Sequence, residues 1–219
     1  NNEINYYYMI EYLDKCVGRI LDTLKETDQV ENTLVIFLSD QGGSYINGYG
    51  RTLRQESLEV ICNARWPGKI PEGIRIQSPW MHYDLFAVFA KLAGAKLPED
   101  RVIDAKNILP LFKGKELPFD RNLYWTANEN CFQDDYPLDA IRSGNWKLLL
   151  YKNKATGNKD LPKMATGTIP YPGKIRGLYN LITDPNEEED LSGEYPEKVK
   201  KLTKCHKKWK AQCHNNQTL

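Results

Sequence analysis

The sequence lacks several features that mark common classes of protein. Lys and Arg number 30 against 29 Asp and Glu, which gives a net charge of +1. Because no surplus of cations exists to neutralise phosphates, we expect no nucleic-acid partner. A membrane-spanning helix needs about 20 residues, and every uncharged apolar run in this sequence is much shorter, so we expect no membrane span. The first residues show no initiator Met and no basic or apolar segment of a signal peptide, which indicates a processed product or a fragment.

Cysteine is scarce and irregularly spaced. The five cysteines are an odd number without a C-x-x-C pair, which disfavours a zinc site (Cys16, Cys62, Cys131, Cys205 and Cys213). Cys205 and Cys213 lie around the end of a predicted helix, where a disulfide between them would close a small loop. Asn216 begins an Asn-Gln-Thr glycosylation sequon. Together these features predict the secretory pathway, with an extracellular or lysosomal location.

The residues that are present describe a globular chain. Of 219 residues 41% are hydrophobic, and 13 Tyr and 5 Trp exclude a disordered tail. This length is enough for at least one domain with its own core.

The first part of the chain alternates helical and strand patterns. Residues 5–26 predict an amphipathic helix with one apolar stripe. The unbroken apolar run Leu34–Leu38 predicts a strand covered on both faces, as in a parallel sheet. Residues 44–65 predict irregular structure. Residues 81–93 predict a second helix that ends at Gly94, with four apolar side chains facing inward (Leu85, Val88, Phe89 and Leu92).

The pattern changes to that of an antiparallel sheet near residue 120. Residues 143–145 predict a hairpin turn and 152–176 a long loop, and a last helix is predicted over 195–212, with Val199, Leu202 and Trp209 on one side. Four segments predict strands: 121–126, 140–142, 146–151 and 178–181. We therefore divide the chain into residues 1–120 and 121–219.

Six segments carry a family resemblance when taken together and in order. They are 12–21 (YLDKCVGRIL), 31–42 (ENTLVIFLSDQG), 65–71 (RWPGKIP), 83–95, 140–148 (AIRSGNWKL) and 178–187. This series resembles the sulfatase family, within the alkaline-phosphatase-like superfamily. The resemblance implies an α/β fold: the C-terminal part of the family's α/β/α domain over residues 1–120. A small α+β subdomain with an antiparallel sheet and a C-terminal helix is implied over 121–219.

The resemblance also shows what these 219 residues do not contain. Sulfatases carry an early pair of Asp ligands and a Cys or Ser in a C-x-P-x-R-type motif, which is converted to the nucleophile formylglycine. The nearest imitation here is Cys62-Asn63-Ala64-Arg65, where the Arg falls one place early. The resemblance therefore places the nucleophile in an upstream segment, and the rest of the sulfatase chain becomes a required partner.

Asp40 and Gln41 are the candidate metal ligands. Asp40 ends a predicted strand, which is where open α/β sheets place ligands. Ca²⁺ is bound by carboxylate and amide oxygens at about 2.3–2.6 Å, and the family resemblance makes the Asp40 position a calcium ligand. Gln41 stands where the family usually has Asn, and its extra methylene either weakens or removes that contact. A turn in which Asp40 caps its own backbone is the alternative.

Arg51 and Arg54 are the candidate sulfate contacts, and Arg51 is also the candidate catalytic residue. Arg51 aligns with a family Lys that contacts sulfate, and a guanidinium binds oxyanions through a planar fork. Arg54 is the substitute candidate. An exposed loop arginine is the alternative for Arg51, because Ser57 and Leu58 replace the two glycines found in the family.

Other polar residues have weaker assignments. His82, at the start of the second helix, is interpreted as structural. Seven lysines lie between Lys198 and Lys210. They suit either a sulfated polysaccharide or the solvated face of an amphipathic helix.

The favoured function is that of the C-terminal portion of a hydrolase that cleaves sulfate esters by a formylglycine and Ca²⁺ mechanism. Its substrate would be a sulfated small molecule or a sulfated polysaccharide. The alternative is a catalytically degenerate sulfatase-like protein that acts as a binding or structural module, favoured by departures at Gln41, Arg51, the lost glycines and Ala105. A phosphatase or phosphodiesterase of the same superfamily is disfavoured by the Trp-Pro-Gly segment and the R-x-G-x-W-K hairpin.

Overall fold

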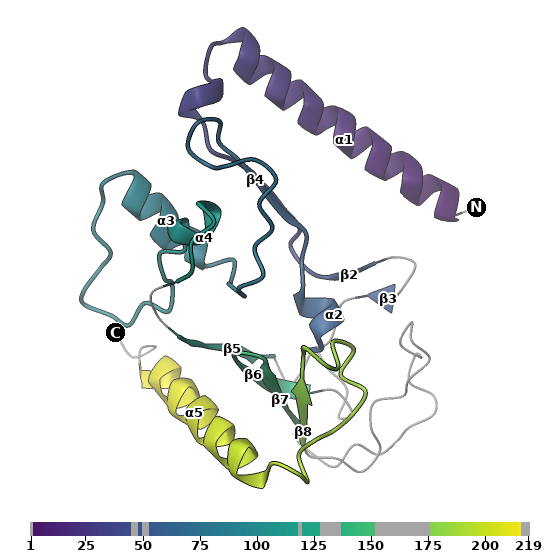
Figure 1. Cartoon of the computed structure of the whole chain (residues 1–219), viewed down its shortest axis with the longest axis vertical. Helices are drawn as coiled ribbons and strands as arrows, with labels where there is room; N and C mark the ends of the chain where they lie inside the picture. The colour runs from purple at the N-terminus through teal and green to yellow at the C-terminus, as the bar shows by residue number, and fades with distance from the viewer. Residues whose placement is uncertain are drawn as a thin grey trace.

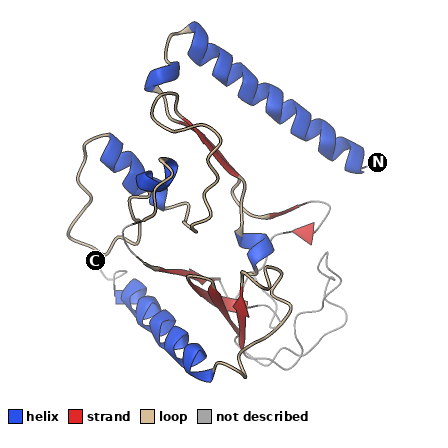
Figure 2. Ribbon diagram, in the orientation of Figure 1, coloured by secondary structure: helices blue, strands red, loops and turns tan. Residues whose placement is uncertain are grey.

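The structure is a computed structural model, which describes residues 2–44, 48–49, 53–117, 120–127, 137–151 and 176–215 (Figure 1). It mixes helices with three small antiparallel sheets (Figure 2), consistent with the predicted α/β class. None of the helices in the described part of the chain is long and apolar enough to cross a membrane. The predicted division near residue 120 remains a prediction.

The first helix, α1 (Asn2–Glu26), matches the helix predicted over residues 5–26. It extends away from the rest of the chain and reaches it through its C-terminal end (Figure 1). The short 3₁₀ turn η1 (Val30–Asn32) comes after it. Much of the apolar surface of α1 is exposed, at Ile4, Tyr7, Tyr8, Met9, Ile10, Tyr12, Leu13 and Ile20.

The strand β1 (Val35–Leu38) lies where a strand was predicted, but its environment differs from the prediction. It pairs antiparallel with β4 (Cys62–Arg65), with Ile36 opposite Ala64, and all four of its residues are half-buried. The prediction of irregular structure over 44–65 is wrong at β4, which alternates half-buried and exposed residues in the period of a strand. In the structure, β1 has an antiparallel neighbour on one side. The apolar run had instead predicted parallel neighbours and burial of both faces of the strand.

Short elements lie between these two strands and after them. Two-residue strands β2 (Gly43–Ser44) and β3 (Gly48–Tyr49) pair with each other, and the helical turn α2 (Gln55–Leu58) comes next. After β4 come α3 (Asp84–Leu92) and α4 (Leu109–Phe112).

The helices α3 and α4 form a core around Val88, Ile108, Leu111 and Phe112. Gly94 ends α3 with φ of 69°, as the predicted C-terminal stop requires. The inward assignment of two α3 side chains is wrong, because Phe89 and Leu92 are 50% and 38% exposed. Ala87 and Asp84 are buried in their place.

Asp84 joins three segments at the base of α3. Its carboxylate accepts the backbone N–H of Met81 at 2.7 Å and of Lys106 at 2.9 Å, and it pairs with the guanidinium of Arg121. Asp84 has no exposed surface, and a buried carboxylate of this kind is stable only when paired and hydrogen-bonded. This network holds the start of α3 against the chain that enters the four-stranded sheet.

That sheet is antiparallel in the order β5-β6-β7-β8, from β5 (Asn122–Thr126), β6 (Pro137–Ser143), β7 (Trp146–Tyr151) and β8 (Arg176–Asn180). Its strands confirm the four predicted ones. The predicted hairpin turn joins β6 to β7, and Gly144 there has the φ of 57° that a two-residue turn needs. The long loop predicted over 152–176 lies outside the described residues, apart from its last residue in β8.

Both faces of this sheet are covered, which explains the apolar run in β7. Side chains of one face pack on α5 (Pro196–Asn215) in a cluster of Ile141, Leu148, Leu178, Val199 and Leu202. The neighbouring residues along each strand point the other way and pack with Leu53 beside α2: Ala140, Leu149 and Tyr179. Figure 1 accordingly shows α5 and α2 on opposite sides of the sheet. The sheet thus separates the surface of α5 from the segments around α2.

Candidate functional site

A cavity of about 980 Å³, open to solvent, is bordered by the chain after β1, the segment from α2 to β4, residues 76–83 and the four-stranded sheet. Its polar lining includes Asp40, Gln41, Glu59, His82 and Arg142. A carboxylate, an amide and a guanidinium, the groups that bind cations and oxyanions, therefore line one space.

Asp40 and Gln41 lie directly after β1, both exposed and both in the cavity wall. Their turn is held by Ser39, whose Oγ donates to the carbonyl oxygen of Gln41 at 2.7 Å. The Ser39 N–H donates to the carbonyl oxygen of Ile61 at 3.0 Å. Between the described residues, no hydrogen bond or ion pair engages the Asp40 carboxylate. The pair is therefore presented to the cavity on a fixed turn.

Gly42 lets α2 pack against this turn. Its N–H donates to the carbonyl oxygen of Ser57 at 2.9 Å. A Cβ at residue 42 would lie 2.4 Å from the carbonyl oxygens of both Glu56 and Glu59. Because those are backbone atoms, no side-chain rotation relieves the clash. The close approach of α2 thus requires glycine here.

His82 supports the same turn from another segment of the chain. Its Nε2 lies 2.9 Å from the carbonyl oxygen of Ser39. Since a carbonyl accepts and does not donate, this nitrogen carries the proton. The contact fits the structural interpretation of His82, as a residue that orients the Asp40 turn.

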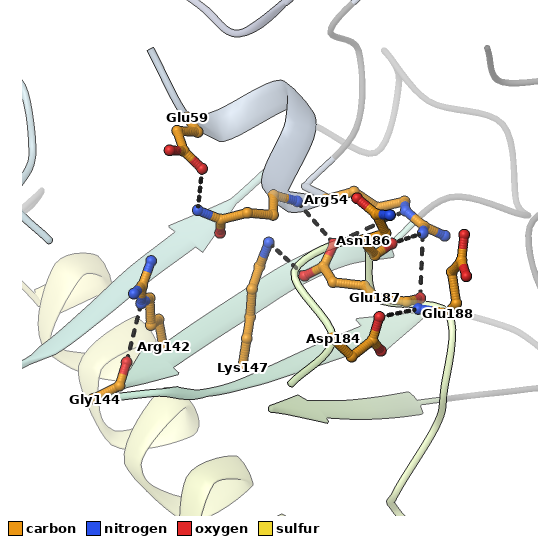
Figure 3. Close-up of polar contacts among 10 residues, drawn as sticks. Arg54, Glu59, Arg142, Gly144, Lys147, Asp184, Asn186, Glu187 and Glu188 are labelled. Atoms are coloured by element: carbon orange, nitrogen blue, oxygen red, sulfur yellow. Dashed lines mark hydrogen bonds and ion pairs between the residues drawn. The ribbon is translucent and has the colours of Figure 1, made fainter. Parts of the chain in front are cut away.

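A buried charge network lies where α2 meets the sheet (Figure 3). Glu187 is its centre: Oε1 lies 2.7 Å from Lys147 Nζ, and Oε2 accepts the backbone N–H of Gln55 at 2.7 Å. Lys147 is fully buried and Glu187 is 1% exposed. The network ties the N-terminus of α2 to β7 and to the chain after β8.

Arg54 belongs to this network, which corrects its assignment as a substrate contact. Its guanidinium donates to the carbonyl oxygens of Asn186 and, at 3.2 Å, of Glu187, and only 5% of Arg54 is exposed. It does not line the cavity. The guanidinium serves to hold the loop around Glu187.

The loop around Glu187 has an unusual backbone. Glu187 adopts φ of 57°, a left-handed conformation uncommon for residues other than glycine. The carboxylate of Asp184 holds the loop by accepting the N–H groups of Glu188 at 3.0 Å and Glu189 at 2.9 Å. Such conformations persist where the surroundings fix them, here the interactions of the Glu187 side chain.

Arg142 and Lys147 are directly opposite each other on β6 and β7. Like charges in this position repel, and Glu187 neutralises Lys147. Arg142 is half-buried and lines the cavity, and its Nε donates to the carbonyl oxygen of Gly144 at 3.0 Å (Figure 3). Burial lowers the pKa of the Arg142 guanidinium, and Glu59 and Glu187 oppose that shift. Arg142 therefore supplies a cation in the cavity wall.

Burial also shifts the pKa of Lys147, Tyr83 and Cys62. The loss of solvent lowers the pKa of Lys147 to about 8, while Glu187 opposes the shift. Burial raises the pKa of Tyr83, in the cavity wall, to about 12. It also raises the pKa of the Cys62 thiol, so Cys62 is protonated and a poor nucleophile at neutral pH.

The remaining predicted residues divide into two groups. Arg51 and Asn216 lie outside the described residues. The predicted bridge between Cys205 and Cys213 does not form, since both are free thiols. The helix α5 continues through both positions, and eight residues of helix rise about 12 Å, beyond the about 7 Å that a disulfide spans.

A calcium site would be incomplete on these residues. The described part of the chain contains no group of three or more His, Cys, Asp or Glu side chains that could hold a metal ion. Asp40 and Gln41 provide two oxygen-bearing side chains, whereas Ca²⁺ takes about six to eight oxygen ligands. Their donor chemistry fits Ca²⁺, and the remaining ligands would have to come from elsewhere.

Sequence reasoning missed Arg142, Lys147 and Glu187 as a group. A signal was present for Lys147, which lies inside an apolar strand on the same face as Leu149. No local pattern joins it to Glu187, 40 residues further along the chain.

Comparison with known proteins finds similarity to sulfatases. Residues 4–95 match the model of the family described as Sulfatase. The human protein named steryl-sulfatase is 37% identical over 123 residues, covering 48% of this chain and 21% of that protein. The ulvan-active sulfatase of Formosa agariphila is 29% identical over 219 residues, covering 93% of this chain and 42% of that protein.

Solved structures agree with these matches. The crystal structure of Ps i-CgsB in complex with k-i-k-neocarrahexaose superposes with a TM-score of 0.74 at 26% identity, covering 92% of this chain and 41% of that chain. The chain thus spans less than half the length of the proteins it matches.

Proposed function

We propose that this chain, which is a member of the sulfatase family, is the C-terminal portion of an enzyme that hydrolyses sulfate esters of saccharides. The observation that carries the proposal is the cavity whose wall contains Asp40, Gln41 and Arg142 around one space. The sulfatase match over residues 4–95 contains the Asp40 turn. Saccharides are favoured because one relative is named as ulvan-active and one solved neighbour holds a neocarrahexaose.

Asp40 and Gln41 take the role of metal ligands in this proposal. They lie on a turn fixed by Ser39, His82 and the approach of α2. When bound there, Ca²⁺ would neutralise charge on the sulfate oxygens. The side chains of Asp40 and Gln41 would hold the Ca²⁺ ion at the cavity wall.

Arg142 takes the role of a sulfate contact in the described part of the cavity. Its Nε donates to the carbonyl oxygen of Gly144, and this contact restricts the orientation of the terminal nitrogens. A guanidinium pairs with tetrahedral oxyanions through two N–H groups. Arg51 remains a second proposed contact.

The nucleophile is proposed to be a formylglycine in an upstream segment of the same protein. The half-buried Cys62, with its raised pKa, is a poor substitute. A secretory location, lysosomal or extracellular, and glycosylation at Asn216 belong to the same proposal.

The test is sulfate release by the full-length protein from sulfated oligosaccharides. Asp40→Asn keeps the shape and removes the charge, and we expect kcat/KM to fall by at least about 100-fold. The matched control is Asp28→Asn, because Asp28 is exposed, lies outside the cavity and has φ of 55°, which Asn tolerates. We expect the control to retain wild-type activity.

Two outcomes would contradict the proposal. Equal activity in Asp40→Asn and wild type would remove Asp40 from the site. Binding of sulfated saccharides without any sulfate release would favour the degenerate binding module instead.

A further inference from the structure

Charge is strongly segregated at the C-terminal end of the chain. Residues 184–197 contain seven acidic residues and no Lys or Arg, whereas residues 198–215 contain seven lysines and no acidic residue. This division occurs in a chain whose net charge is +1. The basic part coincides with α5.

Five of the seven lysines form one exposed surface, here called the lysine face: Lys200, Lys201, Lys204, Lys207 and Lys208. At about 100° per residue, they fall within an arc of about 120° and extend over about 12 Å of helix. Val199, Leu202 and His206 occupy the opposite side and are buried. The lysine face therefore points away from the sheet.

The other two lysines are used by the fold. Lys198 Nζ lies 4.0 Å from the centroid of the Trp146 ring, and Lys210 Nζ lies 3.0 Å from Asp139. Within the described residues, no carboxylate pairs with any ammonium of the lysine face. The face is thus a set of solvated cations that the packing of α5 does not use.

Helix stability does not account for this arrangement. Like charges four residues apart, as in Lys200 with Lys204 and Lys204 with Lys208, destabilise a helix by about 0.2–0.5 kcal/mol each. The helix dipole favours cations in the last turn, but Lys200 and Lys201 lie in the second turn from the start of α5. The stability of α5 therefore gives no reason for the lysine face.

We propose that the lysine face is a docking surface for a sulfated polysaccharide, on the side of the sheet opposite the cavity. The choice of a sulfated polysaccharide among polyanions rests on the proposed function, whereas the cationic surface does not. A single-stranded nucleic acid is less suited, because it requires aromatic rings on which its bases stack, whereas the nearby rings of Tyr124 and Trp209 stack on each other, with centroids 4.9 Å apart. An anionic membrane is also less suited, because α5 exposes no large apolar side chain beside these lysines.

The experiment measures binding of the full-length protein to dextran sulfate and to unsulfated dextran. One variant replaces all five residues of the lysine face with Gln. The matched control replaces five exposed lysines elsewhere with Gln, at Lys91, Lys96, Lys106, Lys113 and Lys115. We expect the lysine-face variant to lose at least about tenfold in affinity for dextran sulfate at low salt, and to show a smaller salt dependence. The control should stay within about twofold of wild type, and unsulfated dextran should not bind.

A second measurement separates this inference from the proposed function. Sulfate release from a small sulfated saccharide should be unchanged in the lysine-face variant, while KM for a sulfated polymer rises. If the protein releases no sulfate at all, the proposed function fails while the binding result still stands. Replacement of the five lysines by Arg should preserve dextran sulfate binding. Equal losses in both Gln variants, unchanged binding, or duplex DNA bound as tightly as dextran sulfate would overturn the inference.

Discussion

Arg142 and Lys147 are neighbours in the sheet with different roles. They face each other across β6 and β7. Among the described residues, Lys147 has a close carboxylate partner, Glu187 at 2.7 Å, and Arg142 has none. The buried pair fixes α2 against the sheet, and Arg142 lines the cavity. The division of roles follows from the position of Glu187, which contacts Lys147.

Substitution of Arg142 should weaken substrate binding. We expect Arg142→Gln to raise KM for a sulfated saccharide by about 10–100-fold, the effect of losing one charge-assisted contact. Arg142→Lys should recover part of that loss, because it keeps the charge without the planar fork. Steady-state kinetics on the full-length protein provide the measurement, with Arg101→Gln, an exposed site outside the cavity, as the control. A KM unchanged in Arg142→Gln would remove this residue from the binding site.

Lys147 should make stability depend on alkaline pH. Its pKa is lowered to about 8 from an ordinary value of 10.5, so between these values the unfolded chain binds more protons than the folded chain. The free energy of unfolding should therefore rise with pH in this window, by up to about 1.4 kcal/mol per pH unit. Below about pH 8 both states are protonated, and the cost of burying the charge is present in full.

The measurement is denaturant unfolding of wild type and Lys147→Met from about pH 7 to about pH 11, which spans the window. The difference between them should be flat up to about pH 8 and then shift in favour of wild type. A difference that stays constant across the whole range would show that Lys147 titrates normally.

Local sequence located the candidate residues at the end of a strand, and it missed the residues that the fold assembles from distant segments. Asp40 and Gln41 could be located because a carboxylate after an apolar strand is a local pattern. Arg54 was misassigned because its partners, Asn186 and Glu187, lie 132 and 133 residues away. A loop arginine and a buried arginine look the same in sequence.

The turn after β1 depends on one glycine. A Cβ at Gly42 would lie 2.4 Å from two carbonyl oxygens, so Gly42→Ala must displace α2. We expect a loss of about 1–3 kcal/mol in the free energy of unfolding, as for other overpacked sites. Sulfate release should fall as well, because the Asp40 turn moves with it.

Thermal or denaturant unfolding and sulfate release measure both effects. Gly193→Ala is the matched control, because no atom lies within 4 Å of the added Cβ. Equal stability in the two variants would mean that the turn tolerates a wider separation from α2.

At the scale of elements, long periodic segments were predicted well. The helix α1, the strands of the four-stranded sheet and the helix α5 are all explained by apolar periodicity and turn residues. The strand β4 was missed because Cys-Asn-Ala-Arg is short and has little apolar character. The expectation of parallel neighbours for β1 was wrong. An apolar run indicates how deeply a strand is buried, but not whether the neighbouring strand runs parallel or antiparallel.

At the scale of the whole molecule, a large apolar surface is left uncovered along α1. Eight of its large apolar side chains are exposed, among them Ile4 at 49% and Met9 at 70%. Contiguous apolar surface of this kind marks an interface, and we expect it to pack against other parts of the full-length protein.

Residues 1–219 expressed alone should therefore self-associate. Size-exclusion chromatography and binding of a hydrophobic dye should show aggregates and exposed apolar surface, both absent in the full-length protein. A variant with Tyr8, Met9 and Tyr12 replaced by Ser should aggregate less, whereas serine at the exposed Ile182, far from α1 in the sequence, should not help. A monodisperse product that melts cooperatively would contradict this account.

The most direct test of the central proposal is intact mass and peptide mapping of the protein from its native source. The account predicts a chain heavier than the 25.3 kDa of these residues, with a formylglycine at a Cys or Ser position N-terminal to Asn1. A mature chain of 25.3 kDa, or a longer chain in which that position is unmodified or missing, would contradict a formylglycine sulfatase mechanism.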